Sequence, residues 1–218
     1  MLLNPGLAFE TWEEIANSRL SIGSTIPTVA PNVLFTIGHS TRAIEEFIEL
    51  LNAHHVRHLV DVRSIPKSRH VPQFNAETLA SSLRVAGIDY THLKPLGGRR
   101  HSRKDSINTG WRNTSFRGYA DYMATSQFAE GLATLMQIAS TTPTAIMCAE
   151  AVPWRCHRSL IADVMILQDW QVRDILTAAP ASEHRLTPFL KVVNGQPTYP
   201  DPSEPGSLFK QTQKEFSS

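Results

Sequence analysis

A short segment beyond the middle of the chain concentrates the residue types that could carry chemistry. It reads TAIMCAEAVPWRCHRSLIA from Thr144 to Ala162 and holds both cysteines of the protein, Cys148 and Cys156. The apolar residues 145–148 predict a buried strand, and the apolar spacing from Trp154 onward predicts a helix. A thiol at the end of a strand, in front of the free N–H groups of a helix, is where a thiolate or a bound anion is stabilised. The segment therefore predicts a functional site.

Cys148 is the first candidate nucleophile, because Arg155 and Arg158 follow closely in the sequence and favour its thiolate form. Its setting resembles the loops of rhodanese-like enzymes and cysteine phosphatases, where a strand-end cysteine precedes a turn and an arginine at a helix start. Glu150 and Pro153, however, stand where those loops favour glycines and N–H donors. The alternative is that Cys148 is a small buried core residue.

Cys156 and His157 are expected in the first turns of the following helix. A metal site could combine Cys148, Cys156 and His157 with His39 as a fourth ligand. Seven residues separate the two cysteines, however, whereas zinc sites usually space a cysteine pair by two to four, so we predict no cofactor. A redox pair of Cys148 and Cys156 would need Cα atoms within about 7 Å. The alternatives are core packing for Cys156 and a surface or helix-cap position for His157, in place of an acid–base role.

Two carboxylates, Asp61 and Glu150, stand at the ends of predicted strands. Either could act as a general base, but for Asp61 we favour an ion pair with an arginine, because buried carboxylates are usually paired. Arginine forks suit phosphate or carboxylate groups, and a solvated loop is the alternative for Arg99 and Arg100. The candidate catalytic residues are Cys148, Glu150, His157, His39 and Asp61. The candidate anion-binding residues are Arg63, Arg69, Arg99, Arg100, Arg155 and Arg158.

Strands and helices alternate along the chain and must position these residues. Apolar runs predict strands at residues 33–38, 57–63, 88–93, 145–148 and 172–176. Helical spacing predicts helices between residues 44 and 51, 75 and 87, 119 and 125, and 127 and 139, and one beginning near residue 154. Two strands joined by one helix form a right-handed parallel unit. We therefore predict an α/β fold, with a mainly parallel sheet flanked by helices in a single compact domain.

Ligands of such sheets bind beyond the carboxyl ends of the strands, and here four strand ends carry ionisable groups. Strand by strand, these groups are His39; Asp61 and Arg63; His92, followed by Arg99 and Arg100; and Cys148 and Glu150. We expect their side chains to meet at one rim of the sheet and to bind a small anionic ligand there.

Composition sets the limits of this prediction. The 218 residues, 41% hydrophobic and 19% charged, suit one domain with a substantial core. The chain has no apolar run of about 18 residues and no signal-peptide pattern at its N-terminus, so we expect no membrane contact, a cytoplasmic location and reduced thiols. We divide the chain into an N-terminal extension (1–31), the α/β domain (32–193) and a poorly structured tail (194–218), with irregular structure expected from His184 onward.

The charge of the chain is unevenly distributed. Residues 94–117 hold seven Lys or Arg and one Asp, whereas the whole chain has a net charge of only +1. This basic loop, with Trp111, Phe116 and Tyr119 interleaved, could bind nucleic acid through phosphate contacts and base stacking. Core packing is the alternative for the three aromatic residues, and the near-neutral total charge counts against a nucleic-acid partner.

Seven sequence blocks, in order, resemble a known family. They are TIGHST, VDVRSIPKSR, PQFN, GIDYTHLKPLGGRR, GYADYM, MCAEAVPWRCHRSLIADV and HRLTP. Together they resemble the bacterial family called domain of unknown function 488, over about residues 33–188, with residues 1–31 and 195–218 outside the likeness. The resemblance implies a cytosolic, compact α/β domain with a shared site, and it supplies no reaction.

Three functions are therefore open. The first is an enzyme that acts on a small anionic or phosphate-bearing substrate, with Cys148 as nucleophile or Glu150 as general acid–base, in the manner of a thiol-dependent transferase or hydrolase. The second is a nucleic-acid-binding protein, in repair or base modification, that uses the basic loop 94–117. The third is a thiol redox or metal-responsive protein built on Cys148 and Cys156.

Overall fold

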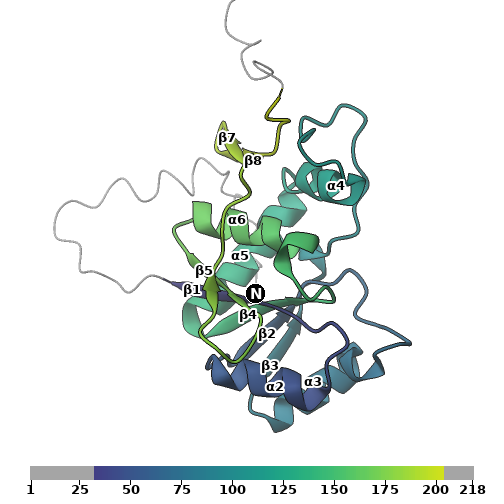
Figure 1. The fold of residues 1–218 in the computed structure, drawn as a ribbon, viewed down its shortest axis with the longest axis vertical. Helices are drawn as coiled ribbons and strands as arrows, with labels where there is room; N and C mark the ends of the chain where they lie inside the picture. Colours follow the sequence, from purple (N-terminus) through teal and green to yellow (C-terminus); the bar gives the residue numbers. More distant parts are fainter. Residues whose placement is uncertain (1–31, 204–218) are drawn as a thin grey trace, which may run out of the picture.

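Six strands form one sheet in the order β3-β2-β4-β1-β5-β6, and helices cover both of its faces (Figure 1). The computed structural model describes residues 32–203, so the predicted N-terminal extension lies outside the described residues. The strands are β1 (Val33–Gly38), β2 (His58–Asp61), β3 (Asp89–His92), β4 (Thr144–Cys148), β5 (Gln171–Ile175) and β6 (Ser182–Glu183). Neighbouring strands are parallel except β5 and β6. The predicted α/β fold with a mainly parallel sheet is confirmed.

Within residues 32–203, five helices and three short 3₁₀ turns connect the strands. The helices are α2 (Ile44–Ala53), α3 (Ala76–Val85), α4 (Thr114–Tyr122), α5 (Ser126–Thr141) and α6 (Arg158–Leu167). The 3₁₀ turns are η1 (Pro72–Phe74), η2 (Lys94–Leu96) and η3 (Pro153–Arg155). Among residues 32–203, no helix combines the length and the apolar character needed to cross a lipid bilayer.

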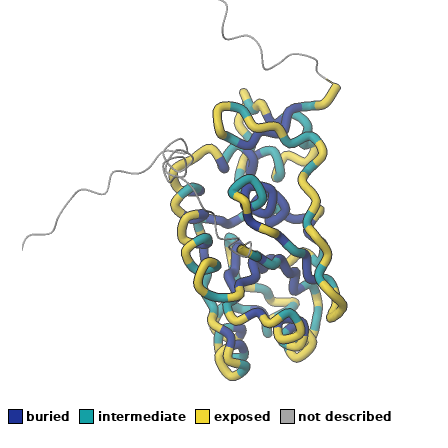
Figure 2. The backbone as a smooth tube through the Cα atoms, turned by 90° about the vertical axis from the view of Figure 1, so that its left-hand side faces the viewer, coloured by how far each residue is buried: buried dark blue, intermediate teal, exposed yellow. Residues whose placement is uncertain are grey.

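The core lies in two layers, one on each face of the sheet. Helices α2 and α3 bury Phe47 and Leu79 in one layer, whereas α5 and α6 bury Leu132 and Leu160 in the other. Burying an apolar side chain of this size contributes about 1.5–3 kcal/mol. Figure 2 shows the buried segments running through the middle of the molecule and the exposed ones along its outer surface. The apolar stripes of the predicted helices therefore face the sheet.

The alternation of side chains along β4 decides which face receives Cys148. Successive strand residues point to opposite faces, so Ala145 and Met147 join the layer of α2 and α3. Ile146 and Cys148 join the layer of α5 and α6. Cys148 therefore meets residues that arrive from the α4–α6 side of the sheet.

The chain leaves the adjacent strands β1 and β4 toward opposite faces of the sheet. From β1 it continues into α2, and from β4 into α6, and these helices belong to different core layers. The two strands end together, with Gly38 paired to Cys148. A crevice forms beyond the carboxyl ends of strands at such a switch point, which places the cysteine-bearing loop at the binding edge of the fold.

Two helices begin elsewhere than their apolar spacing indicates. Helix α4 begins at Thr114, five residues before the predicted start, because the Asn113 side chain accepts a hydrogen bond from the N–H of Ser115 and caps it. After β4, η3 comes first and α6 begins only at Arg158, because Cys156 has extended backbone angles (φ −136°, ψ 142°). Cys156 and His157 therefore precede the helix. The prediction that they lie in its first turns is wrong.

The expectation of irregular structure from His184 onward is wrong for the described part of that segment. Strands β7 (Lys191–Val193) and β8 (Gln196–Thr198) form a hairpin, and Tyr199 is fully buried. Asp163 in α6 holds the segment in place: its carboxylate accepts hydrogen bonds from the Tyr199 hydroxyl at 3.0 Å and the Thr187 hydroxyl at 2.7 Å. These long-range contacts, and not local propensity, order the chain here, so the core extends beyond the predicted boundary at residue 193.

A buried histidine should make the stability of this region depend on pH. Burial by itself lowers the pKa of His184, but the carboxylates of Asp163 and Asp174 outweigh burial and raise this pKa to about 9. The stabilising charge is fully present below the ordinary histidine pKa, about 6.5, and is lost as the pH rises through about 9. We expect the free energy of unfolding to fall by about 3 kcal/mol over this range, measured by urea unfolding at several pH values.

The His184→Gln variant is the comparison that isolates this histidine from the other titrating groups. Its unfolding free energy should lack the same fall, whereas His55→Gln, at an exposed position after α2, should retain it. An equal pH dependence in wild type and His184→Gln would contradict the assignment.

Candidate functional site

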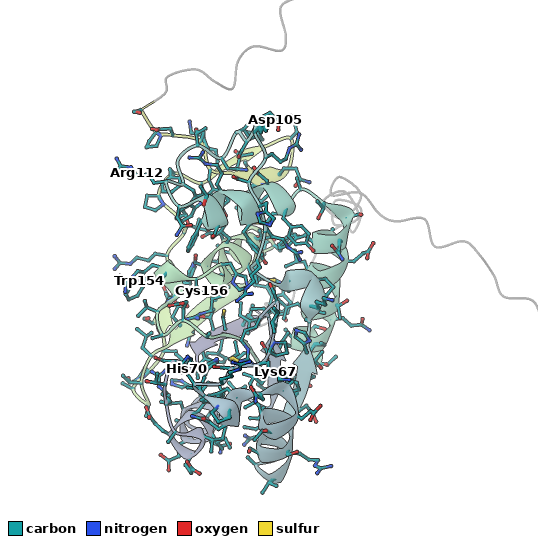
Figure 3. The ribbon with its side chains drawn as sticks, turned by 90° about the vertical axis from the view of Figure 1, so that its right-hand side faces the viewer. Lys67, His70, Asp105, Arg112, Trp154 and Cys156 are labelled. Atoms are coloured by element: carbon teal, nitrogen blue, oxygen red, sulfur yellow. The ribbon has the colours of Figure 1, made fainter. Side chains whose placement is uncertain are left out.

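A cavity of about 670 Å³ opens at the carboxyl edge of the sheet, where the sequence predicts a common rim. Cys148, Cys156 and His157 line it from the β4 end and the loop before α6. Lys67 and His70 line it from the long connection between β2 and α3. Lys67, His70 and Cys156 are labelled in the side view of Figure 3. The cavity is thus built from segments far apart in the sequence.

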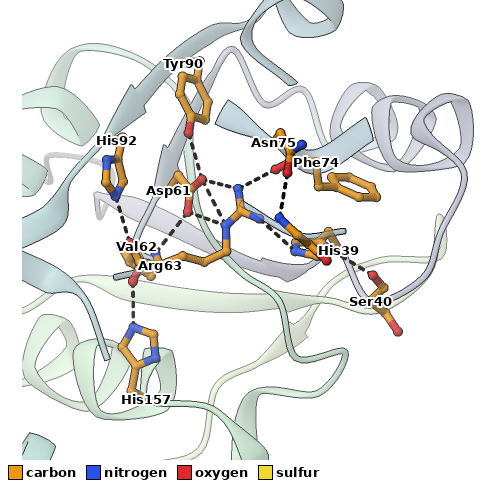
Figure 4. Close-up of polar contacts among 11 residues, drawn as sticks. His39, Ser40, Asp61, Val62, Arg63, Phe74, Asn75, Tyr90, His92 and His157 are labelled. Atoms are coloured by element: carbon orange, nitrogen blue, oxygen red, sulfur yellow. Dashed lines mark hydrogen bonds and ion pairs between the residues drawn. The ribbon is translucent and has the colours of Figure 1, made fainter. Parts of the chain in front are cut away.

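The sulfur atoms of both cysteines converge on one nitrogen of His157. The distances from Nδ1 are 3.9 Å to Cys148 Sγ and 3.6 Å to Cys156 Sγ. The other ring nitrogen, Nε2, lies 2.9 Å from the carbonyl oxygen of Val62 (Figure 4). Because a carbonyl only accepts, Nε2 carries a proton, and in the neutral ring Nδ1 is the nitrogen that can accept a proton from a thiol.

The two thiols are electrostatically unequal. A hydrogen bond from Cys156, followed by the contacts with His157 and the nearby Arg158 cation, holds the pKa of Cys148 well below its usual range, although burial opposes this. Burial raises the pKa of Cys156 well above its usual range, and its hydrogen bond to Cys148 adds to the rise. The arrangement therefore favours a thiolate at Cys148 and a thiol at Cys156. This is the asymmetry expected of a reactive cysteine with a donor beside it.

The same three side chains could hold a metal ion. Their ligand atoms all lie within 4.8 Å of one another. Sulfur and nitrogen atoms bound tetrahedrally to zinc, at about 2.3 and 2.1 Å, lie about 3.6–3.8 Å apart, close to the observed distances. The bond from His157 to a backbone carbonyl is also typical of metal-binding histidines. Cys148, Cys156 and His157 could therefore bind a thiophilic ion, although the cysteine spacing argues against it.

His39, which we considered as a fourth ligand and as a catalytic residue, is already occupied at both nitrogens. Its Nε2 accepts from Arg63 at 3.1 Å, since an arginine can only donate, and its Nδ1 donates to the carbonyl oxygen of Ser40 at 2.8 Å. Burial lowers the pKa of His39, and the Arg63 cation adds to this. The ring also stacks on Phe74 at a centroid distance of 4.3 Å. His39 lines the cavity as a neutral, fixed wall.

Asp61 and Arg63 form the buried ion pair that we favoured for this carboxylate (Figure 4). Arg63 Nε lies 2.9 Å from Asp61, and the same guanidinium donates to the carbonyl oxygen of Phe74 at 2.8 Å. Asp61 also accepts from the hydroxyl of Tyr90 at 2.8 Å. Asp61 does not line the cavity, and Arg63 reaches it with Nε, Nη1 and Nη2 each already making a hydrogen bond, to Asp61, His39 and Phe74. In this geometry the two side chains hold each other and the strand ends, while the catalytic role considered for Asp61 and the anion-binding role considered for Arg63 remain predictions.

Arg158, which we predicted to bind an anion, contacts the backbone of the loop after Cys148. It is fully buried, and its guanidinium donates to the carbonyl oxygens of Glu150 at 2.6 Å and Ala151 at 3.0 Å. It does not line the cavity. Arg158 therefore fixes the backbone of the loop after Cys148, and its charge helps to lower the pKa of Cys148 without reaching the cavity. The side chain of Glu150, by contrast, is exposed at the cavity.

The cations that do face the cavity come from three separate loops. Arg99 and Arg155, both predicted, line it and are exposed, as is Lys67. Arg69 does not line the cavity, and Arg100 lies over the ring of Tyr122 at 3.6 Å. Lys67 was missed, although it follows the second strand in the same loop as Arg69.

Two small residues that we did not predict as part of the site, Ser64 and Gly98, also line the cavity. The backbone N–H of Arg99 donates to the hydroxyl of Ser64 at 2.9 Å, which ties two of the loops together. Gly98 lies against the ring of His157, so closely that a Cβ on this residue would overlap the ring. The GG pair before Arg99 is the only sequence signal for this close approach.

A family model described as "Domain of unknown function DUF488" matches residues 43–165, more than half of the chain. No curated protein and no solved structure matches the chain. The matched range runs from the start of α2 to α6 and includes the loops with Lys67, Arg99 and Cys148.

Proposed function

The chain belongs to the DUF488 family, and from this premise we propose that it is an enzyme acting on a small anionic or phosphate-bearing substrate through the thiolate of Cys148. The observation that carries the proposal is the cavity in which a thiol cluster and three exposed cations meet. The family description names no reaction, so the proposal is drawn from the chemistry of these side chains.

The cavity divides between binding and reaction. Arg99, Arg155 and Lys67 would bind the anionic part of the substrate, because arginine forks and ammonium groups complement phosphate and carboxylate. The thiolate of Cys148 would attack an electrophilic atom of the substrate and form a covalent bond with it while the bond to the leaving group breaks. His157 Nδ1, next to both sulfurs, would take the thiol proton of Cys148 and give it to the leaving group. This is the chemistry of a thiol-dependent transferase or hydrolase.

Alkylation of Cys148 tests the thiolate and the cationic cavity together. We expect iodoacetamide to modify Cys148 with an apparent pKa well below the value of a free thiol, about 8.5. We also expect the ratio of the iodoacetate rate to the iodoacetamide rate to be higher for Cys148 than for free cysteine, because the cavity attracts anionic reagents. The rates would be measured by mass spectrometry of the Cys148 peptide across pH.

A pair of arginine variants provides the control. Arg155→Ala should slow iodoacetate several-fold and iodoacetamide much less, whereas Arg112→Ala, at an exposed position that does not line the cavity, should change neither rate. An apparent pKa at or above about 8.5, or equal slowing of both reagents by Arg155→Ala, would count against the proposal.

The nucleic-acid alternative keeps only part of its expected stacking surface. Tyr119 is fully buried, whereas Trp111 and Phe116 are half-buried and pack on each other at 4.6 Å. Such a partner would therefore depend mainly on phosphate contacts from the basic loop. Binding of this kind would weaken steeply with salt, so a filter-binding measurement at several salt concentrations separates it from the enzyme proposal.

A further inference from the structure

The second cysteine has no part in the mechanism proposed so far, yet its sulfur lies at the cavity beside the first. We infer that Cys148 and Cys156 form a reversible disulfide by exchange with a small anionic disulfide bound in the cavity. The inference rests on the proposed function and narrows its substrate to one chemical class.

The geometry provides an attacking sulfur and a second sulfur within reach. Both cysteines line the cavity, and the two sulfurs and His157 Nδ1 lie within 4.8 Å of one another. Cys156 lies between η3 and α6, outside both helical segments. A side-chain rotation there can bring its sulfur toward bonding distance, about 2.05 Å, without unwinding a helix.

The positions of the two thiols assign the order of events. Cys148 is the more exposed of the two, 8% against 3% for Cys156, so it attacks the bound disulfide first, while Cys156 still carries its thiol proton. His157 Nδ1 lies 3.6 Å from the Cys156 sulfur and can remove that proton. One residue thus attacks the substrate and the other resolves the product, as in dithiol redox proteins generally.

The exchange balances without any further reactant. Cys148 thiolate attacks one sulfur of the disulfide RSSR, forms a mixed disulfide and releases RS⁻. Cys156 then loses its proton to His157, its sulfur attacks the Cys148 sulfur, and the second RS⁻ leaves and takes up the proton. The protein is oxidised to the Cys148–Cys156 disulfide while RSSR is reduced to two thiols, and the reverse exchange restores the dithiol.

The lining of the cavity indicates the charge of R. Lys67, Arg99 and Arg155 line the same cavity as the thiols, and Glu150 is the one carboxylate among its lining residues. Carboxylate-bearing disulfides complement this excess of positive charge, and a space of about 670 Å³ is within the range of sites for small organic molecules.

Mass spectrometry of the full chain after incubation with oxidised glutathione tests the inference. The wild-type protein should lose two hydrogen atoms in mass and yield a peptide cross-linked between Cys148 and Cys156. Cys156→Ser should stop at a stable mixed disulfide on Cys148, and Cys148→Ser should form neither product. Cystamine, a cationic disulfide, should react several-fold more slowly than oxidised glutathione, relative to free cysteine.

Each contrary result has a defined meaning. A mixed disulfide that persists equally in wild type and Cys156→Ser would overturn the inference while leaving Cys148 as a reactive thiolate. Stoichiometric zinc that protects both thiols until a chelator is added would also overturn it. If Cys148 reacts with neither disulfide and alkylates like a free thiol, the proposed function itself fails. The wild-type measurement decides the cross-link even if a cysteine variant does not fold.

Discussion

Replacing Asp61 with alanine should lower the free energy of unfolding by about 3–5 kcal/mol, because the change leaves the buried Arg63 cation without its counter-charge. Asp61 is fully buried and the side chain of Arg63 is only 7% exposed, so water can make up for little of the lost interaction. The Tyr90 hydroxyl would lose its acceptor as well. Urea unfolding of the variant and the wild type measures the difference.

An exposed ion pair provides the matched control. Arg103 and Asp105 form a salt bridge with side chains 66% and 71% exposed, and such pairs contribute little. Asp105→Ala should therefore leave the unfolding midpoint nearly unchanged. If Asp61→Ala were as mild as Asp105→Ala, the Asp61–Arg63 pair would not organise this end of the sheet.

The sheet could be predicted because its strands are nearly continuous apolar runs. The runs that become β1 and β4 are buried on both faces, and their composition alone reports that burial. The start of α6 could not be predicted in the same way. Residues at helical spacing, such as Leu160 and Val164, show which side faces the core, but they do not show that Cys156 is extended.

The ordered part of the C-terminal segment shows a second limit. Its prolines predict irregular structure, but its order depends on the contacts of Tyr199 and Thr187 with Asp163. These partners are separated by 36 and 24 positions in the chain. Local composition therefore does not show whether the segment packs, because long-range contacts decide it.

The sequence predicted where the candidate site lies, at one edge of the sheet, but not the contacts of its individual residues. Strand ends identified His39, Arg63 and Cys148 as neighbours, because parallel strands deliver their carboxyl ends to one side. The chemical role of each side chain depends on its hydrogen-bond and ion-pair partners, which the sequence does not identify. Arg158 and Arg155 are three residues apart, yet one is fully buried against carbonyl groups and the other lines the cavity. The two side chains differ in position because Arg155 ends η3 and Arg158 begins α6, with the extended Cys156 between them.

The loop that carries the site should be displaced by a single added methyl group at Gly38. A Cβ at this position would overlap the carbonyl oxygen of Glu150 and lie 2.8 Å from that of Ala151. Both groups are backbone atoms held by Arg158, so they cannot rotate away. We expect Gly38→Ala to destabilise the protein by about 1–3 kcal/mol and to change the alkylation rate of Cys148 several-fold, measured by urea unfolding and mass spectrometry.

A second glycine distinguishes damage to the site from a general loss of stability. Gly131 lies in α5 and does not line the cavity, and the atoms nearest to a Cβ there would belong to the side chains of Pro95 at 2.9 Å and Leu96 at 3.1 Å. Gly131→Ala should therefore alter stability without altering the reactivity of Cys148. If Gly38→Ala left that reactivity at the wild-type rate, the backbone of residues 150–151 would not set the position of the thiol. The effect of Arg158 on Cys148 would then act through its charge alone.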